Sequence, residues 1–181
     1  MRSIVETLQP KVPYRVRGWL GPAITRFGKT LGQPEYRLRD TEYVGTVNRP
    51  LDEFTETLQD HGFEWDPLAW YHQPPVGSEP NGSWTYRETL LADRQIHVIL
   101  IAHSPEYIDV FAHEEYSWLR HPIKHLRQVG IERKAGRNEI RRWLERHGVE
   151  IDVKSRRLRR ASHAMRDFRK YLGSVVPERV I

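Results

Sequence analysis

The sequence contains no cysteine. This absence excludes disulfide bonds, thiol catalysis and zinc sites built on thiolates. Long hydrophobic runs are also absent, because no stretch approaches the roughly 20 apolar residues that a membrane-spanning helix needs. The first residues, MRSIVETLQPKVPYRV, include no continuous apolar segment, so we expect no secretory signal there.

Several short functional motifs are missing as well. There is no GxxxxGK[ST] phosphate-binding loop, no GxGxxG dinucleotide motif and no GxSxG nucleophile elbow. The stretch from HPIKHLRQ to HGVE does not form a recognisable helix-turn-helix. We therefore expect a non-enzymatic protein with no catalytic residue, no cofactor and no small-molecule substrate.

Charge of each sign is concentrated in different parts of the chain. Residues 1–34 hold six basic residues and one acid, residues 35–116 hold five basic and sixteen acidic residues, and residues 117–181 hold eighteen basic residues and seven acids. Arginine outnumbers lysine 23 to 6, and its planar guanidinium suits phosphate and carboxylate partners. An acidic middle between two basic ends predicts a polyanion partner or acidic–basic contacts between copies.

We predict an α+β fold in three parts. Residues 1–34 form an extended basic N-terminal arm that prolines and glycines interrupt, either a disordered leader or an arm that folds against a partner through Trp19 and Phe27. Residues 35–116 form an acidic α+β body with an antiparallel sheet. Residues 117–181 form a basic C-terminal region that is mainly helical.

Alternating apolar residues predict the strands of the body. SWTYRETLL, RQIHVILIAH and YIDVFAH read as an antiparallel meander, and YRLRDTEYVGTV as one or two further strands. If residues 104–106 form a three-residue turn, His103 faces Tyr107 and His97 lies opposite His113. PLDEFTETLQDHG predicts a flanking helix that ends near Gly62. Residues 66–82 read as a long loop whose Trp70 and Tyr71 form a contact surface or a lid on the core.

The C-terminal region predicts helices. HPIKHLRQVG is a short helix from Pro122, NEIRRWLERHG is a helix capped by Asn138 and closed by Gly148, and VEIDV is a brief edge strand. In KSRRLRRASHAMRDFRKYLG, helical periodicity places Leu158, Ala161, Met165, Phe168 and Leu172 on one stripe. Basic residues and a histidine cluster on the opposite face: Arg156, Arg159, Arg160, His163, Arg166 and Lys170.

This amphipathic helix is the main predicted binding element. Its apolar stripe, with Leu158, Met165, Phe168 and Leu172 as interface residues, is expected to dock on the body or on another copy, which leaves the basic face pointing outward. Arg156, Arg159, Arg160, Arg166 and Lys170 would then contact DNA or an acidic protein partner. An anionic membrane is a weaker fit because the apolar side lacks bulk, and a plain solvated face is the simplest alternative.

The histidines give no standard metal motif. His97 and His113 are predicted cross-strand neighbours, His121 and His125 share a face if helical, and Glu114 and Glu115 lie between them. A His/carboxylate metal site is the alternative, but we interpret these residues as surface or packed histidines and predict no metal. Tyr116 near paired histidines is reminiscent of rolling-circle endonucleases, whose two histidines are separated by one residue, unlike the five between His97 and His103.

The segment RQIHVILIAHSPEYIDVFAHEEYSWLRHPIKHL, Arg94–Leu126, resembles uncharacterised proteins of haloarchaeal tailed viruses and proviruses. The preference for arginine and the acidic middle are similar to that group, whereas the basic overall charge departs from it. The resemblance implies a viral or mobile-element origin, in a virion or the host cytoplasm. We therefore expect a structural component of an assembly whose partners are other copies, other proteins or DNA. A DNA-binding accessory protein is the alternative, and a metal-dependent nuclease is the third hypothesis.

Overall fold

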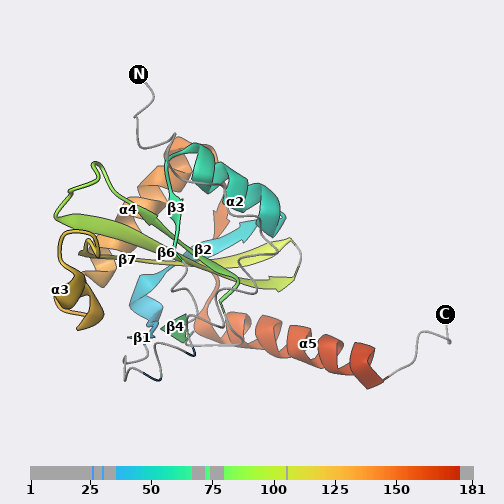
Figure 1. Ribbon diagram of the computed structural model, residues 1–181. Coiled ribbons are helices and arrows are strands. Elements are labelled where there is room, and N and C mark those ends of the chain that lie inside the picture. The colour runs from blue at the N-terminus through green and yellow to red at the C-terminus, as the bar shows by residue number, and fades with distance from the viewer. Residues whose placement is uncertain are drawn as a thin grey trace.

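The computed structural model of the protein describes Arg26, Thr30 and residues 36–66, 72–73, 80–104 and 106–175, without the side chains of Lys170, Ser174 and Val175. Figure 1 shows a sheet with helices against it, so the predicted α+β class is confirmed. Apart from Arg26 and Thr30, the predicted N-terminal arm, with Trp19 and Phe27, lies outside the described residues, as do Trp70 and Tyr71. None of the described helices is long and apolar enough to cross a membrane.

The described residues form both strands and helices. The strands are β1 (Tyr36–Arg37), β2 (Tyr43–Asn48), β3 (Glu64–Trp65), β4 (His72–Gln73), β5 (Gly82–Tyr86), β6 (Arg94–Ser104), β7 (Tyr107–Tyr116) and β8 (Ile151–Asp152). The helices are a 3-10 turn η2 (Asp40–Glu42) and the α-helices α2 (Leu51–Asp60), α3 (Pro122–Leu126), α4 (Arg133–Arg146) and α5 (Arg156–Val175).

The main sheet is antiparallel, with strand order β3-β5-β6-β7-β2-β8, and β1 pairs with β4 in a separate two-stranded sheet. The predicted meander is confirmed in β5, β6 and β7, and His97 does lie opposite His113. The prediction that His103 faces Tyr107 is wrong, because Ser104 pairs with Tyr107. A bulge between Ala102 and Ser104 takes up the extra residue.

One face of the sheet packs against α2 and α4 to form the larger apolar core. Alternate residues of β6 and β7 point into it, including Val98, Leu100 and Val110, and they meet Phe54 of α2 and Leu144 of α4. The helix predicted around Leu51, Phe54 and Leu58 is confirmed as α2, and Gly62 closes it with a φ of +84°. Burial of this apolar surface is the main stabilising contribution to the fold.

Helix α4 begins five residues before the predicted start at Asn138. Glu114 of β7 and Glu132 exchange two backbone hydrogen bonds, of 2.7 and 3.1 Å, so the chain enters α4 directly from a bridge to the sheet. Gly136 then brings the helix against β7, because a Cβ there would overlap the backbone of His113 and Glu114. The strand β5 also ends earlier than predicted, at Tyr86, since Glu88 and Leu90 lie in the turn before β6.

Candidate functional site

The sheet face opposite α2 and α4 is apolar in its middle and polar at both ends. Along β6 this face presents Gln95, His97, Ile99, Ile101 and His103. The first four pair on β7 with Glu115, His113, Phe111 and Asp109, in that order, and His103 lies in the bulge. The apolar middle, completed by Tyr36, Leu38 and Tyr43, separates two buried polar clusters.

Helix α5 docks over the Asp109 end through its basic side. Arg159 is only 2% exposed, although its residue type is almost never buried without a partner. Its Nη2 donates a 2.6 Å hydrogen bond to Asp40 Oδ1, and its guanidinium lies 3.9 Å from the ring centroid of Tyr43. An ion pair and a cation–π contact therefore fasten the first turns of α5 to the body.

The next turn of α5 adds a buried histidine. His163 Nε2 lies 2.9 Å from Asp109 Oδ2, and Thr46 donates a 2.6 Å hydrogen bond to Asp109 Oδ1. Burial opposes the charged carboxylate, yet these two hydrogen bonds keep the pKa of Asp109 below its ordinary value. On the other side of Asp109, burial lowers the pKa of His103 to about 4.

The remaining predicted binding residues of α5 are placed differently. Arg166 donates a hydrogen bond to the carbonyl oxygen of Ala102, and Arg156 forms a 3.3 Å ion pair with Asp40. Arg160 is exposed, and the side chain of Lys170 lies outside the described residues. The expectation that the basic face points outward is therefore wrong for Arg159 and Arg166, which face the body.

The apolar stripe of α5 points into solvent. Leu158, Met165, Phe168 and Leu172 are between 41% and 60% exposed, so this stripe does not dock on the body of its own chain. Figure 1 shows α5 running outward from beneath the sheet, with its C-terminal end clear of the other elements. The alternative that the stripe contacts another copy remains a prediction.

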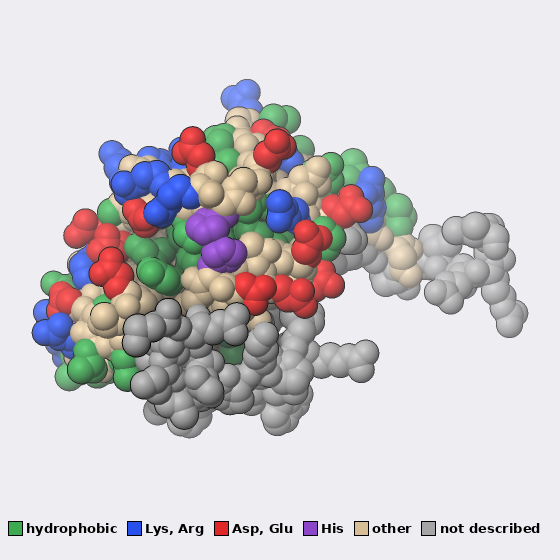
Figure 2. Space-filling view, turned by 90° about the horizontal axis from the view of Figure 1, so that it is seen from above, with side chains coloured by type: hydrophobic (Ala, Val, Ile, Leu, Met, Phe, Trp, Pro, Cys, Tyr) green, Lys and Arg blue, Asp and Glu red, His purple; other side chains and the backbone are tan. Residues whose placement is uncertain are grey.

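Charge is mixed on the face seen in Figure 2. Basic and acidic side chains are interspersed there, and neither sign forms one continuous surface. The acids Asp52, Glu53, Glu56 and Asp60 are exposed on α2. This view offers no broad basic surface for a polyanion.

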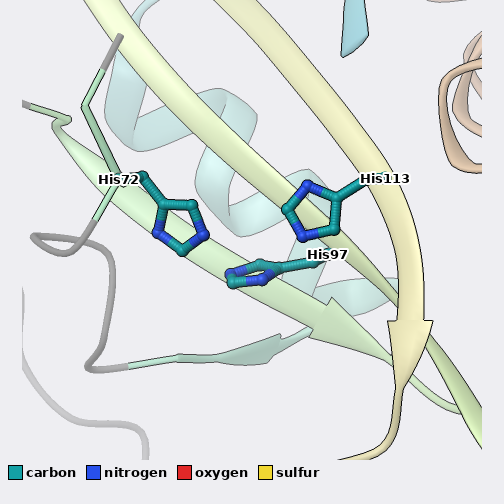
Figure 3. Close-up of side chains that lie close together, drawn as sticks. All are labelled: His72, His97 and His113. Atoms are coloured by element: carbon teal, nitrogen blue, oxygen red, sulfur yellow. The ribbon is translucent and has the colours of Figure 1, made fainter. Parts of the chain in front are cut away.

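The other buried polar cluster lies on the same sheet face, the one opposite α2 and α4, at the end away from α5. His97 and His113 point toward one another from β6 and β7, and His72 of β4 joins them (Figure 3). All three are buried, with exposures of 1%, 1% and 7%, and one ligand nitrogen from each lies within 4.8 Å of the others. The predicted pairing of His97 with His113 is therefore part of a larger group of histidines.

Buried carboxylates surround these histidines. Glu42 Oε1 lies 2.8 Å from His113 Nδ1, and Glu115 Oε1 lies 3.0 Å from His97 Nδ1. Burial disfavours the charged ring, but Glu115 and Glu42 outweigh it and raise the pKa of His113 to about 9. The nearby histidines in turn hold the pKa of Glu115 well below its ordinary value despite burial.

A comparison with protein-family models, curated proteins and solved structures finds no match to this chain. Sequence reasoning missed Asp40, Tyr43 and Asp109 as the docking partners of α5, and His72 as a member of the histidine group. The alternation along β7 did carry a signal for Asp109, since a charged residue sits between Ile108 and Val110 in a strand buried on both faces.

Proposed function

We propose that this protein is a non-enzymatic structural subunit that assembles with further copies of itself through α5. The observation that carries the proposal is the orientation of α5. Arg159 and His163 on its polar side contact Asp40, Tyr43 and Asp109, while four large apolar side chains of its stripe are exposed. Contiguous exposed apolar surface of this kind is typical of interaction sites.

A second copy offers a surface that can cover this stripe, because the opposite side of the molecule also exposes apolar side chains. We call these residues the end patch; they are Leu90, Leu91, Trp118, Leu119, Ile123 and Leu126. The patch is held together by the 3.3 Å hydrogen bond from Arg120 to the Leu91 carbonyl and by the 2.6 Å contact of His121 with Asp93. Figure 1 places α3, which carries part of the patch, and the free end of α5 on opposite sides of the molecule.

A contact between the stripe of one copy and the end patch of the next is head-to-tail. Such heterologous contacts extend into rings or filaments rather than stopping at a dimer. The resemblance of Arg94–Leu126 supports a viral or mobile-element particle as the setting, in the virion or the host cytoplasm. Basic residues that stay exposed on α5, Arg157, Arg160 and Arg169, are the candidates for contacts with acidic neighbours or DNA.

Mass in solution tests the proposal. We expect wild-type protein to exceed the 21.5 kDa of one chain in light scattering after size exclusion, with or without DNA. The double variant Leu158→Ser, Phe168→Ser should return to the monomer mass while keeping the wild-type circular dichroism spectrum, because both side chains are exposed within the subunit.

Val153→Ser is the matched control. Val153 is 58% exposed just before α5 but lies outside the stripe, so its loss should leave the mass of the assembly unchanged. A monomeric wild-type protein at all concentrations would contradict the proposal. Association that requires DNA and weakens steeply with salt would favour the DNA-binding alternative instead.

A further inference from the structure

We propose that His72, His97 and His113 bind a divalent transition-metal ion, with Zn²⁺ as the reference ion. This inference is independent of the assembly role. The three histidines lie on the sheet face opposite α2 and α4, at the end away from α5. Three imidazoles from β4, β6 and β7 converge on one point in the interior (Figure 3). Three histidine ligands with an open fourth position are a known coordination set for zinc.

The backbone fixes two of the three ligands. His97 and His113 are directly paired residues on adjacent strands, and their ring centroids are 5.1 Å apart. His72 approaches from the small β1–β4 sheet, with ring-centroid distances of 4.6 Å to His97 and 5.9 Å to His113. Tetrahedral zinc with Zn–N bonds of about 2.0–2.1 Å needs ligand nitrogens about 3.4 Å apart. The three nitrogens, which lie within 4.8 Å of one another, therefore move closer together when they bind one ion.

The carboxylates supply the orientation that metal-binding histidines ordinarily have. Glu42 lies 2.8 Å from His113 Nδ1, which turns the Nε2 of that ring toward the group, and Glu115 lies 3.0 Å from His97 Nδ1. The remaining nitrogen of His97 hydrogen-bonds the neutral hydroxyl of Ser83, a partner that a metal ion can replace. Carboxylate–histidine pairs of this kind fix the ring and raise its basicity toward the ion.

The charge of the surroundings also suits a cation. Glu42, Asp66 and Glu115 are each no more than 5% exposed around the three histidines. Among the described residues, Arg133 is the arginine that forms an ion pair with these carboxylates, at 3.6 Å from Glu42. These carboxylates already face the histidines and Arg133, and a divalent ion bound to the three rings would keep a positive charge beside them in the interior.

Packing alone does not explain the composition of the cluster. Next to the His97–His113 pair, the same face of the sheet is filled by Ile99, Ile101 and Phe111, which pack in an apolar core. A cluster of three histidines and adjoining acids buries less apolar surface than such residues would, so it contributes less to the free energy of folding. A metal ion that binds the folded state would offset this loss by mass action.

Metal binding is tested on the full chain with Zn²⁺ and Co²⁺ as probes. After dialysis against excess Zn²⁺ and then metal-free buffer, we expect one zinc per chain by elemental analysis and a higher melting temperature than in chelator-treated protein. Co²⁺ should give the visible absorption of a site with nitrogen and oxygen ligands, and Zn²⁺ should displace it. Absence of both retained zinc and a thermal shift in the wild-type protein would overturn the proposal, whether or not any variant folds.

Two sets of variants locate the ion. His97→Gln or His113→Gln should abolish stoichiometric binding, whereas Glu42→Gln, a positioning variant, should weaken zinc affinity by about 10–100-fold without changing the stoichiometry. His61→Gln is the matched control, because His61 is an exposed histidine whose ring lies 4.3 Å from that of His147, away from the cluster. Retention of stoichiometric zinc in folded His113→Gln, or its loss in His61→Gln, would contradict the assignment to the buried site.

Discussion

The guanidinium of Arg159 lies 3.9 Å from the ring centroid of Tyr43 and donates a 2.6 Å hydrogen bond to Asp40, which is 119 residues earlier in the chain. This contact reverses the usual arrangement of an amphipathic helix, because a charged side chain is buried while leucine and phenylalanine on the same helix are exposed. The body supplies the reason, since the surface under α5 is lined by an acid, an aromatic ring and the buried Asp109.

Arg159→Met is expected to loosen α5. Methionine keeps most of the side-chain volume but removes the cation–π contact and the charge-assisted hydrogen bond, so the free energy of unfolding should fall by about 2 kcal/mol. Denaturant titration followed by circular dichroism measures the change. Arg160→Met, at the neighbouring exposed position, should alter stability by less than about 0.5 kcal/mol, and equal effects of the two variants would argue against the docking described.

Helical periodicity was enough to predict α5 but not its orientation. The alternating spacing of three and four residues in Leu158, Ala161, Met165, Phe168 and Leu172 indicates correctly that these residues share one face. It contains no information about what the rest of the chain presents to that face. The contacts that decide the orientation reach Asp40 and Asp109, at separations of 119 and 54 residues, and no local pattern encodes them.

The pairing of His97 with His113 shows what a sheet pattern can predict. Two apolar strands joined by a short turn fix the register, and with it every cross-strand neighbour up to the bulge at Ala102. His72 could not be found in this way, because it comes from a two-residue strand that pairs with β1 in a separate sheet. The histidine cluster therefore has no linear motif, although two of its members follow from the register.

Stability is expected to fall in mild acid because of His103. Burial lowers its pKa from the ordinary 6.5 to about 4, and the Asp109 charge counteracts this only in part, with His163, Lys154 and Arg166 lowering the pKa further. The unfolded chain therefore takes up a proton near pH 6.5 that the folded chain accepts only near pH 4. The free energy of unfolding should decrease as pH falls between these two values.

His103→Gln isolates this contribution. The variant should show a flatter dependence of melting temperature on pH between about 6.5 and 4 than the wild-type protein, while His61→Gln, at an exposed position, should retain the wild-type slope. Superimposable pH profiles for wild-type protein and His103→Gln would show that the buried ring does not resist protonation.

Gly136 is expected to be essential for the packing of α4 on β7. Alanine is ordinarily the better helix former, but a Cβ at this position would overlap the backbone of His113 and Glu114. Gly136→Ala should therefore lower the free energy of unfolding by about 1–3 kcal/mol. Gly173→Ala is the control: nothing lies near its Cβ position in α5, so stability should stay the same or rise by less than about 1 kcal/mol.

Cross-linking between copies tests most directly the claim that the exposed stripe of α5 meets the end patch of another subunit. The absence of cysteine allows two single-cysteine variants, Met165→Cys in the stripe and Leu91→Cys in the end patch, to be mixed and treated with a short bismaleimide. Isotope labelling of one variant identifies the products by mass. The account predicts cross-linked pairs that join one copy of each variant in the mixture and few or none with either variant alone; efficient pairing of Met165→Cys with itself, or no cross-linking at all, would contradict it.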